Sequence, residues 1–137
     1  MRLTAYTDYA LRCLMHLAMN RDRLVTIQEI ADHQGIVKSH LMKVVHHLGL
    51  LGYVDTIRGR NGGLRLGMEP SELTIGEVVR HTETDFHIAA CFDETNRSCT
   101  SLGQCGLQQA LDRATDSFLA ELDGVTLAPL FRGERET

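Results

Sequence analysis

Two helical segments meet at a glycine in the first third of the chain. In VTIQEIADHQG, Thr26 stands three residues before Glu29, a capping-box spacing. The threonine hydroxyl accepts a hydrogen bond from a free amide there, and the glutamate reaches back to another. Gly35 can adopt the left-handed conformation that ends a helix. The next segment, IVKSHLMKVVHHLGLLG, predicts a longer helix that ends at Gly52. Its inner face carries Leu41, Val44, Val45 and Leu48. This arrangement is the helix-turn-helix pattern.

A β-hairpin is predicted directly after the second helix. YVDTI and LRL are interpreted as two short strands around RGRNGG, in which Asn61-Gly62 is a signal for a type I′ turn. A hairpin in this position is a wing. We therefore predict a mainly α fold with a small β-hairpin wing, completed by a helix over residues 3–18 and a short one in LTIGEVVRH. Cys13 lies on the apolar stripe of the first helix and is expected in the core.

Charge is unevenly distributed along the chain. Residues 36–66 carry five basic side chains and one acidic one, whereas the whole protein has a net charge of −4. A basic centre in an acidic protein indicates contact with a polyanion, although a solvated basic surface would look the same. We expect base reading in the major groove by Ser39, His40 and Lys43, phosphate contacts by lysine and arginine, and a wing arginine in the minor groove. The candidate DNA-binding residues are Lys38, Ser39, His40, Lys43, His46, Arg58, Arg60, Asn61 and Arg65. The alternative is a protein–protein module with the same fold.

From Gly106 onward, apolar side chains recur at helical spacing over about four turns, until Asp123-Gly124. A matching helix from a second copy would cover this stripe in a twofold dimer. The alternative is that the helix folds back on its own subunit. The candidate dimerisation residues are Leu107, Leu111, Ala114, Phe118 and Leu122. The predicted organisation is a winged helix-turn-helix domain over 1–82, a loop over 83–105, and a dimerisation helix with its tail over 106–137.

Three of the four cysteines lie in CFDETNRSCTSLGQC, where apolar residues are sparse. The sequence has no run of eighteen apolar residues, and charged residues interrupt its start, which argues against a membrane span or a signal peptide. We therefore expect a cytoplasmic protein with reduced thiols, so that metal binding or redox sensing is favoured over a disulfide framework. The sequence contains neither a phosphate-binding loop nor a His–Glu metal motif, so no motif in it indicates an enzyme. The seven histidines are interpreted as surface or groove-facing residues.

The chain resembles the NsrR-type nitric-oxide-sensing repressors, iron–sulfur members of a larger group of bacterial winged-helix regulators. The resemblance covers nearly the whole chain. It rests on LTAYTDYALRCLMHLA, RGRNGGLRLG, TIGEVVRHTETDFHIAACF and CGLQQALDRATDSFLAELDGVTLAPL.

The resemblance implies a cytoplasmic homodimer that represses transcription from palindromic operator DNA and responds to nitric oxide. It also implies an iron–sulfur cluster, 4Fe–4S as the first expectation and 2Fe–2S as the second, bound by Cys91, Cys99 and Cys105. Asp8 stands where relatives can supply a fourth ligand from the other subunit; alternatively it is an ordinary acid in a first helical turn. Two other functions stay open. One is a regulator that senses iron or cluster status, and the other is a structural zinc protein with His87 as fourth ligand.

Overall fold

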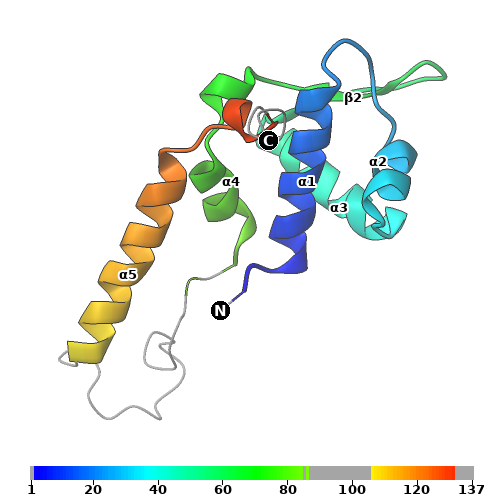
Figure 1. Cartoon of the computed structure of the whole chain (residues 1–137). Helices are drawn as coiled ribbons and strands as arrows, with labels where there is room; N and C mark the ends of the chain where they lie inside the picture. Colours follow the sequence, from blue (N-terminus) through cyan, green and yellow to red (C-terminus); the bar gives the residue numbers. More distant parts are fainter. Residues whose placement is uncertain (1, 85, 87–105, 132–137) are drawn as a thin grey trace.

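The computed structural model describes residues 2–84, 86 and 106–131 (Figure 1). Its elements, in chain order, are α1 (Ala5–Met19), α2 (Ile27–Gln34), α3 (Lys38–Leu50), β1 (Val54–Ile57), β2 (Gly63–Leu66), η1 (Pro70–Glu72), α4 (Ile75–Thr82), α5 (Gly106–Asp123) and η3 (Ala128–Phe131). The prediction of a mainly α-helical fold with a small antiparallel hairpin is confirmed. Within these residues, no helix is both long and apolar enough to span a membrane.

Local signals start and stop the helices of the helix-turn-helix. The Thr26 hydroxyl accepts from the Glu29 amide at 3.1 Å, and Gly35 ends α2 with φ 66°. Gly52, with φ 83°, follows the end of α3. One part of the capping-box prediction is wrong, because the Glu29 carboxylate does not turn back onto its own helix. It accepts hydrogen bonds from Arg23 and His16 instead.

One hydrophobic core joins α1, α2, α3, the hairpin and α4. Leu14 of α1, Ile30 of α2, Leu41 of α3 and Val78 of α4 are all fully buried in it. Cys13 is also fully buried, which confirms its place in the core, and burial raises the pKa of its thiol to about 12.

The hairpin is anchored through Leu64 of its second strand, and the connecting loop extends beyond that anchor. β1 and β2 pair antiparallel from Val54↔Leu66 to Ile57↔Gly63. Leu64 exchanges two backbone hydrogen bonds, of 2.9 and 2.6 Å, with Val25 just before α2. The tip extends away from the body of the molecule (Figure 1). The hairpin is thereby held in one orientation relative to the helix-turn-helix.

The predicted type I′ turn at Asn61-Gly62 is wrong. That turn needs positive φ at both central residues, and neither residue has it; the residue with positive φ in this loop is Gly59, at 113°. Residues 58–62 together connect the two strands, and the Gly62 amide donates to the Gly59 carbonyl at 3.1 Å. A side chain at position 62 would collide with the Ile57 carbonyl, so glycine is required there for space rather than for a left-handed turn.

The segment after α5 returns to the core. Backbone hydrogen bonds join Leu127 to Leu73 at 2.9 Å and Ile75 to Val125 at 2.8 Å. Leu127 is fully buried. Close to this point, Arg80 of α4 forms an ion pair of 2.7 Å with Asp123 at the end of α5. The C-terminal end of α5 is therefore fixed to α4, whereas its N-terminal end extends away from the body (Figure 1). The division of the chain into units 1–82, 83–105 and 106–137 remains a prediction. Val125, Leu127 and Leu130, which belong to the third of these units, pack on the core of the first.

Candidate nucleic-acid interface

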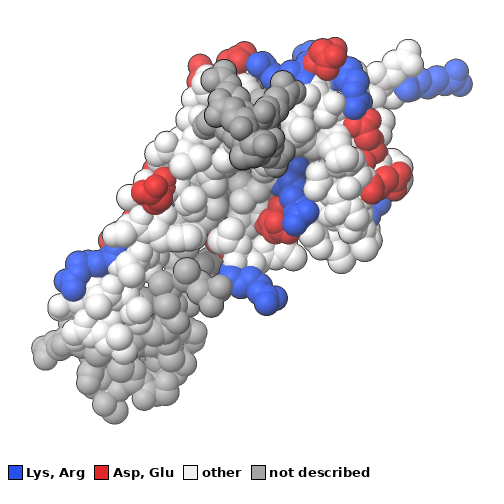
Figure 2. All heavy atoms as spheres, viewed as in Figure 1, with Lys and Arg blue, Asp and Glu red and all other residues white. Residues whose placement is uncertain are grey.

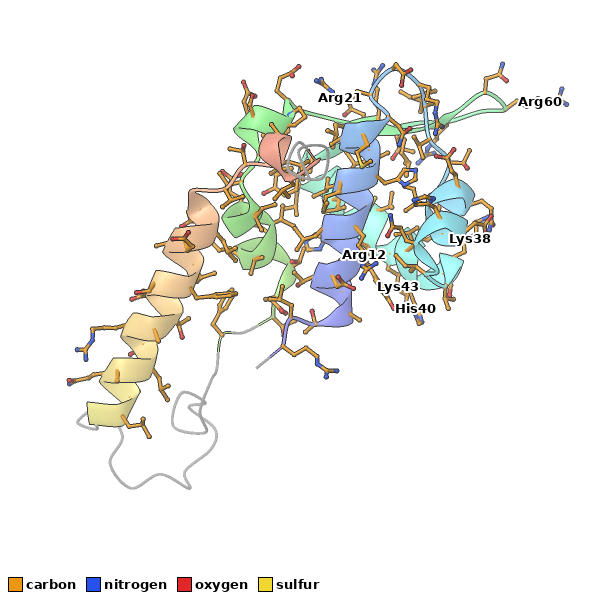
Figure 3. All side chains as sticks on the ribbon, viewed as in Figure 1. Arg12, Arg21, Lys38, His40, Lys43 and Arg60 are labelled. Atoms are coloured by element: carbon orange, nitrogen blue, oxygen red, sulfur yellow. The ribbon has the colours of Figure 1, made fainter. Side chains whose placement is uncertain are left out.

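Helix α3 turns its polar residues outward because its apolar residues are used in the core. Leu41, Val44 and Leu48 are almost completely buried, so the opposite face of the helix points to solvent. All five of the predicted DNA-binding residues on this helix are exposed: Lys38, Ser39, His40, Lys43 and His46. Figure 3 shows Lys38, His40 and Lys43 on this side of the molecule. The helix therefore presents ammonium, hydroxyl and imidazole groups on one accessible surface, as a major-groove reader requires.

The wing supplies the second group of predicted residues. Arg58, Arg60 and Asn61 are exposed in the loop of the hairpin, and Arg60 lies at its far end (Figure 3). In Figure 2, basic side chains stand at this tip clear of the acidic ones. Arg65 is also exposed, but it lies on β2 opposite Asp55, 3.9 Å from that carboxylate. The tip is thus the more available cationic site of the wing.

A hydrogen bond that the sequence did not indicate holds α3 against α1. The Tyr6 hydroxyl and His47 Nδ1 are 2.6 Å apart, and their rings lie 5.7 Å apart between centroids. Burial raises the pKa of Tyr6, so its hydroxyl keeps its proton at neutral pH. His47 is half-buried, unlike the exposed His46 beside it. By its spacing in the sequence Tyr6 belongs to the apolar stripe of the first helix. Its partner His47 is forty-one positions away, so no local pattern connects the two.

A polar cluster fixes α2 to α1. His16 of α1 donates to the Glu29 carboxylate at 2.8 Å, and Arg23 donates to both of its oxygens at 2.8 Å. Arg23 and then His16 hold the pKa of Glu29 down, to about 2. His16 is only 7% exposed, so the prediction that all seven histidines face the surface or a groove is wrong for this one. Its packing edge-to-face against His33 of α2 completes the contact.

The predicted metal ligands are only partly within the described chain. Cys91, Cys99, Cys105 and the alternative ligand His87 lie outside the described residues. Among the described residues, no group of three or more His, Cys, Asp or Glu side chains could hold a metal ion. Asp8 lies in the first turn of α1 with half of its side chain exposed. Its carboxylate is therefore accessible from outside the subunit, as a ligand donated to another chain must be.

Asp8 is connected to the helix-turn-helix through one side chain. Arg12 donates from Nε to the Asp8 carboxylate at 3.1 Å and from Nη1 to the Gln34 side-chain oxygen at 3.4 Å. Gln34 is the last residue of α2. The start of α1 is itself attached to the end of α4, because the backbone amide and hydroxyl of Thr4 donate to the Glu83 carboxylate at 2.8 and 2.9 Å. The candidate carboxylate ligand thus lies between the DNA-reading unit and the helix that precedes the cysteines in sequence.

Helix α5 divides the predicted dimerisation residues into two groups. Toward its C-terminal end, Phe118 and Leu122 are half-buried against the core, and the neighbouring Leu119 is 5% exposed. Toward its N-terminal end, Leu107 is 61% exposed and Ala114 is exposed, with Leu111 half-buried between them. The C-terminal part of the stripe therefore packs on its own subunit, and the N-terminal part is left largely uncovered.

Comparison with known proteins assigns this arrangement to a family. Residues 3–133 match the Rrf2 family, described as iron-dependent transcriptional regulators. The chain belongs to the Rrf2 family. The match includes the helix-turn-helix, the wing and α5.

Relatives with a stated role are similar over almost their full length. An HTH-type transcriptional regulator NsrR from Bacillus subtilis (strain 168) is 50% identical over 137 residues, covering 99% of this chain and 94% of that protein. A regulator of the same name from Geobacillus kaustophilus (strain HTA426) is 46% identical over 131 residues, covering 95% and 89%. These matches confirm the resemblance to NsrR-type regulators. This Rrf2 protein is therefore a DNA-binding transcriptional regulator and not an enzyme.

Solved structures support the same fold at lower identity. IscR from T. potens superposes with a TM-score of 0.78 at 22% identity, covering 99% of this chain and 90% of that one. CymR, the global cysteine regulator of B. subtilis, gives 0.75 at 24% identity, with 95% of each chain covered. These likenesses confirm the winged-helix fold of this Rrf2 chain.

Proposed function

We propose that this protein is a transcriptional repressor that senses nitric oxide through an iron–sulfur cluster and leaves its operator when the cluster is damaged. The exposed groups on α3 and at the wing tip support the DNA-binding part. The names of its relatives and the iron-dependent description of the Rrf2 family support the sensing part.

The donor set fits a cluster in its chemistry. Cys91, Cys99 and Cys105 would supply thiolates, the standard cluster ligands, and Asp8 of a second subunit would supply the fourth donor. We propose a 4Fe–4S cluster, with 2Fe–2S as the alternative. When bound, the cluster would supply iron that reacts with nitric oxide at the expense of its protein ligands. A carboxylate is harder than a thiolate and matches a sulfide cluster less well, so Asp8 would be the most weakly held of the four donors.

The observation that carries the proposal is the contact chain from Asp8 through Arg12 to Gln34. A metal bound by the Asp8 carboxylate would compete for the two oxygens that accept from Arg12 Nε, each at 3.1 Å. Arg12 also bonds the last residue of α2, immediately before the turn into α3. A change in the ligation of Asp8 would therefore alter a contact that helps to place the recognition helix.

A dimer would turn this local change into a change in affinity. Asp8 of one subunit and the three cysteines of the other would tie one DNA-reading unit to the partner's α5. A palindromic operator requires two recognition helices about 34 Å apart, so loosening this tie would weaken binding without altering any residue that touches DNA. The response is a population shift, set by the difference in operator affinity between the two states.

The test compares cluster-loaded and cluster-free protein, prepared anaerobically, for operator binding at one salt concentration. We expect the loaded protein to bind more tightly and to lose affinity on addition of nitric oxide. Cys99→Ala should abolish both the cluster and tight binding. Asp8→Ala should keep a cluster held by three thiolates but respond abnormally to nitric oxide.

Cys13→Ala is the matched control, because it removes a thiol that is buried in the core. This variant should keep both iron and operator binding. Equal operator affinity of the loaded and cluster-free proteins would contradict the proposal. If operator affinity depends on cluster content but does not change when nitric oxide is added, a regulator that senses iron or cluster status is favoured instead. A colourless protein containing zinc would favour the structural zinc site.

A further inference from the structure

The recognition helix exposes an apolar side chain that neither the core nor phosphate binding explains. Met42 is 52% exposed on α3. Three apolar residues next to it on the same helix, Leu41, Val44 and Val45, are at most 4% exposed. Val37, just before the helix, is 60% exposed. A single exposed apolar residue is common on protein surfaces. Whether Met42 has a function therefore depends on which residues surround it.

Met42 lies among the candidate DNA-binding residues. On a helix, residues three or four positions apart are neighbours on the surface. Met42 therefore neighbours Ser39 on the turn before it and His46 on the turn after it, and Lys43 follows it in the chain. All three of these side chains are exposed. A helix face that enters the major groove through these groups carries Met42 into the groove with them.

The chemistry of the groove identifies what Met42 would contact. Of the four bases, thymine alone presents an apolar group at the major-groove edge, its 5-methyl, and apolar side chains recognise it. A thioether side chain is unbranched and adapts to the shape of what it touches. We propose that Met42 is a specificity-determining residue that selects thymine by contact with its 5-methyl group. This inference rests on the proposed DNA-binding role and adds to it the base that the helix prefers.

The experiment removes one methyl group from the DNA at a time. Full-length protein first selects duplexes from a random-sequence pool, which gives a preferred sequence. Each thymine in that sequence is then replaced by deoxyuridine, which keeps the base pair and its hydrogen bonds but lacks the 5-methyl. We expect one position in each half of the sequence at which this replacement raises Kd about fourfold, the value of one buried methyl-sized group. Met42→Ala should bind the thymine duplex several-fold more weakly and show no further loss with deoxyuridine at that position.

Met19→Ala is the control, since Met19 is 56% exposed at the end of α1, outside the helix-turn-helix. It should keep the full deoxyuridine penalty of the unaltered protein. Met42→Leu, which keeps an apolar side chain of similar volume, should keep most of it. The inference is overturned if no thymine methyl affects Kd, or if Met42→Ala retains the same penalty as the unaltered protein. If the protein enriches no duplex at all, it is the proposed DNA-binding function that fails, so the two failures are distinguishable.

Discussion

Arg60 and Arg21 differ in whether an acidic side chain pairs with them. Arg60 at the wing tip forms no ion pair with the residues that the structure describes, whereas Arg21 donates to both oxygens of Glu69 at 2.9 Å. Figure 3 shows Arg21 near the top of the molecule and Arg60 at the end of the hairpin. The two arginines carry equal charge, so they form a matched pair for measuring the contribution of the wing.

Arg60→Ala should weaken binding to every DNA sequence to a similar degree. If Arg60 contacts one phosphate, the slope of log K against log salt should become flatter by about 0.9, because one fewer counterion is released. Titrations at several salt concentrations would measure this slope. Arg21→Ala removes the same charge from an ion pair and should leave the slope unchanged. Unaltered affinity and slope in Arg60→Ala would exclude the wing tip from the interface.

Glu29 joins α1, α2 and the connection between them at a single carboxylate. Its pKa lies at about 2, below the ordinary 4.5, chiefly because Arg23 and His16 donate hydrogen bonds to the charged form. A lowered acid pKa stabilises the folded state fully above pH 4.5, and this contribution is lost as the pH falls toward 2.

Glu29→Gln should therefore lower the free energy of unfolding by about 1 kcal/mol at pH 7, a modest figure because the side chain is 35% exposed and solvent screens the pair. The difference from the unaltered protein should shrink between pH 4.5 and pH 2. Urea unfolding across this range would measure it. Glu72→Gln, at an exposed glutamate, removes the same charge and should have little effect at any pH. A Glu29→Gln loss that does not vary with pH would contradict the electrostatic origin.

At the scale of elements, the turn between α2 and α3 sets the direction of the recognition helix. Gly35 has φ 66°, and a side chain there would meet no atom within 4 Å. The Ile36 amide then donates back to the Ala31 carbonyl at 3.0 Å, and Ile36 is buried. The requirement for glycine is thus one of backbone conformation and not of space.

Gly35→Ala should cost about 1 kcal/mol of stability, because an L-residue with a Cβ is strained in the left-handed region. Gly35→Asn should cost less, since asparagine tolerates that region better, although its side chain is larger. Urea unfolding of both variants would rank them. If the asparagine variant were the less stable of the two, crowding rather than conformation would be the cause.

At the scale of the whole molecule, the uncovered part of α5 is the candidate contact between subunits. Leu107 is 61% exposed near the start of this helix, so changing it should not disturb the monomer. Phe118 packs against the core of its own subunit, and a charge there would also unfold the protein. Leu107 therefore tests the dimer more cleanly than Phe118 does.

Leu107→Glu should convert a dimer into a folded monomer, because a buried carboxylate without a partner is strongly unfavourable in an apolar interface. Sedimentation would measure the mass, and circular dichroism would check the fold. Gln109→Glu adds the same charge at an exposed position of the same helix and should remain dimeric. A Leu107→Glu protein that is still a dimer would place the interface elsewhere.

The predictions that held were local in origin. The ends of α2 and α3 followed from Thr26, Gly35 and Gly52, since a cap or a left-handed residue acts within one helical turn. The exposure of Lys38, Ser39 and Lys43 followed from the spacing of the buried leucine and valine residues on the same helix. Both signals are contained in a few consecutive residues, so the sequence alone was enough.

Long-range contacts decided the rest. The Glu29 carboxylate could accept from its own helix or from side chains elsewhere in the chain. The tertiary fold brings His16 and Arg23 within hydrogen-bond distance of it. Tyr6 and His47 are forty-one positions apart in the sequence. Leu127 is fully buried and donates its amide to Leu73, about fifty residues earlier. Even the turn at Gly59 depends on five connecting residues rather than on the Asn61-Gly62 pair. Such outcomes depend on which elements pack together, because burial and hydrogen bonding are properties of the assembled core and not of any single segment.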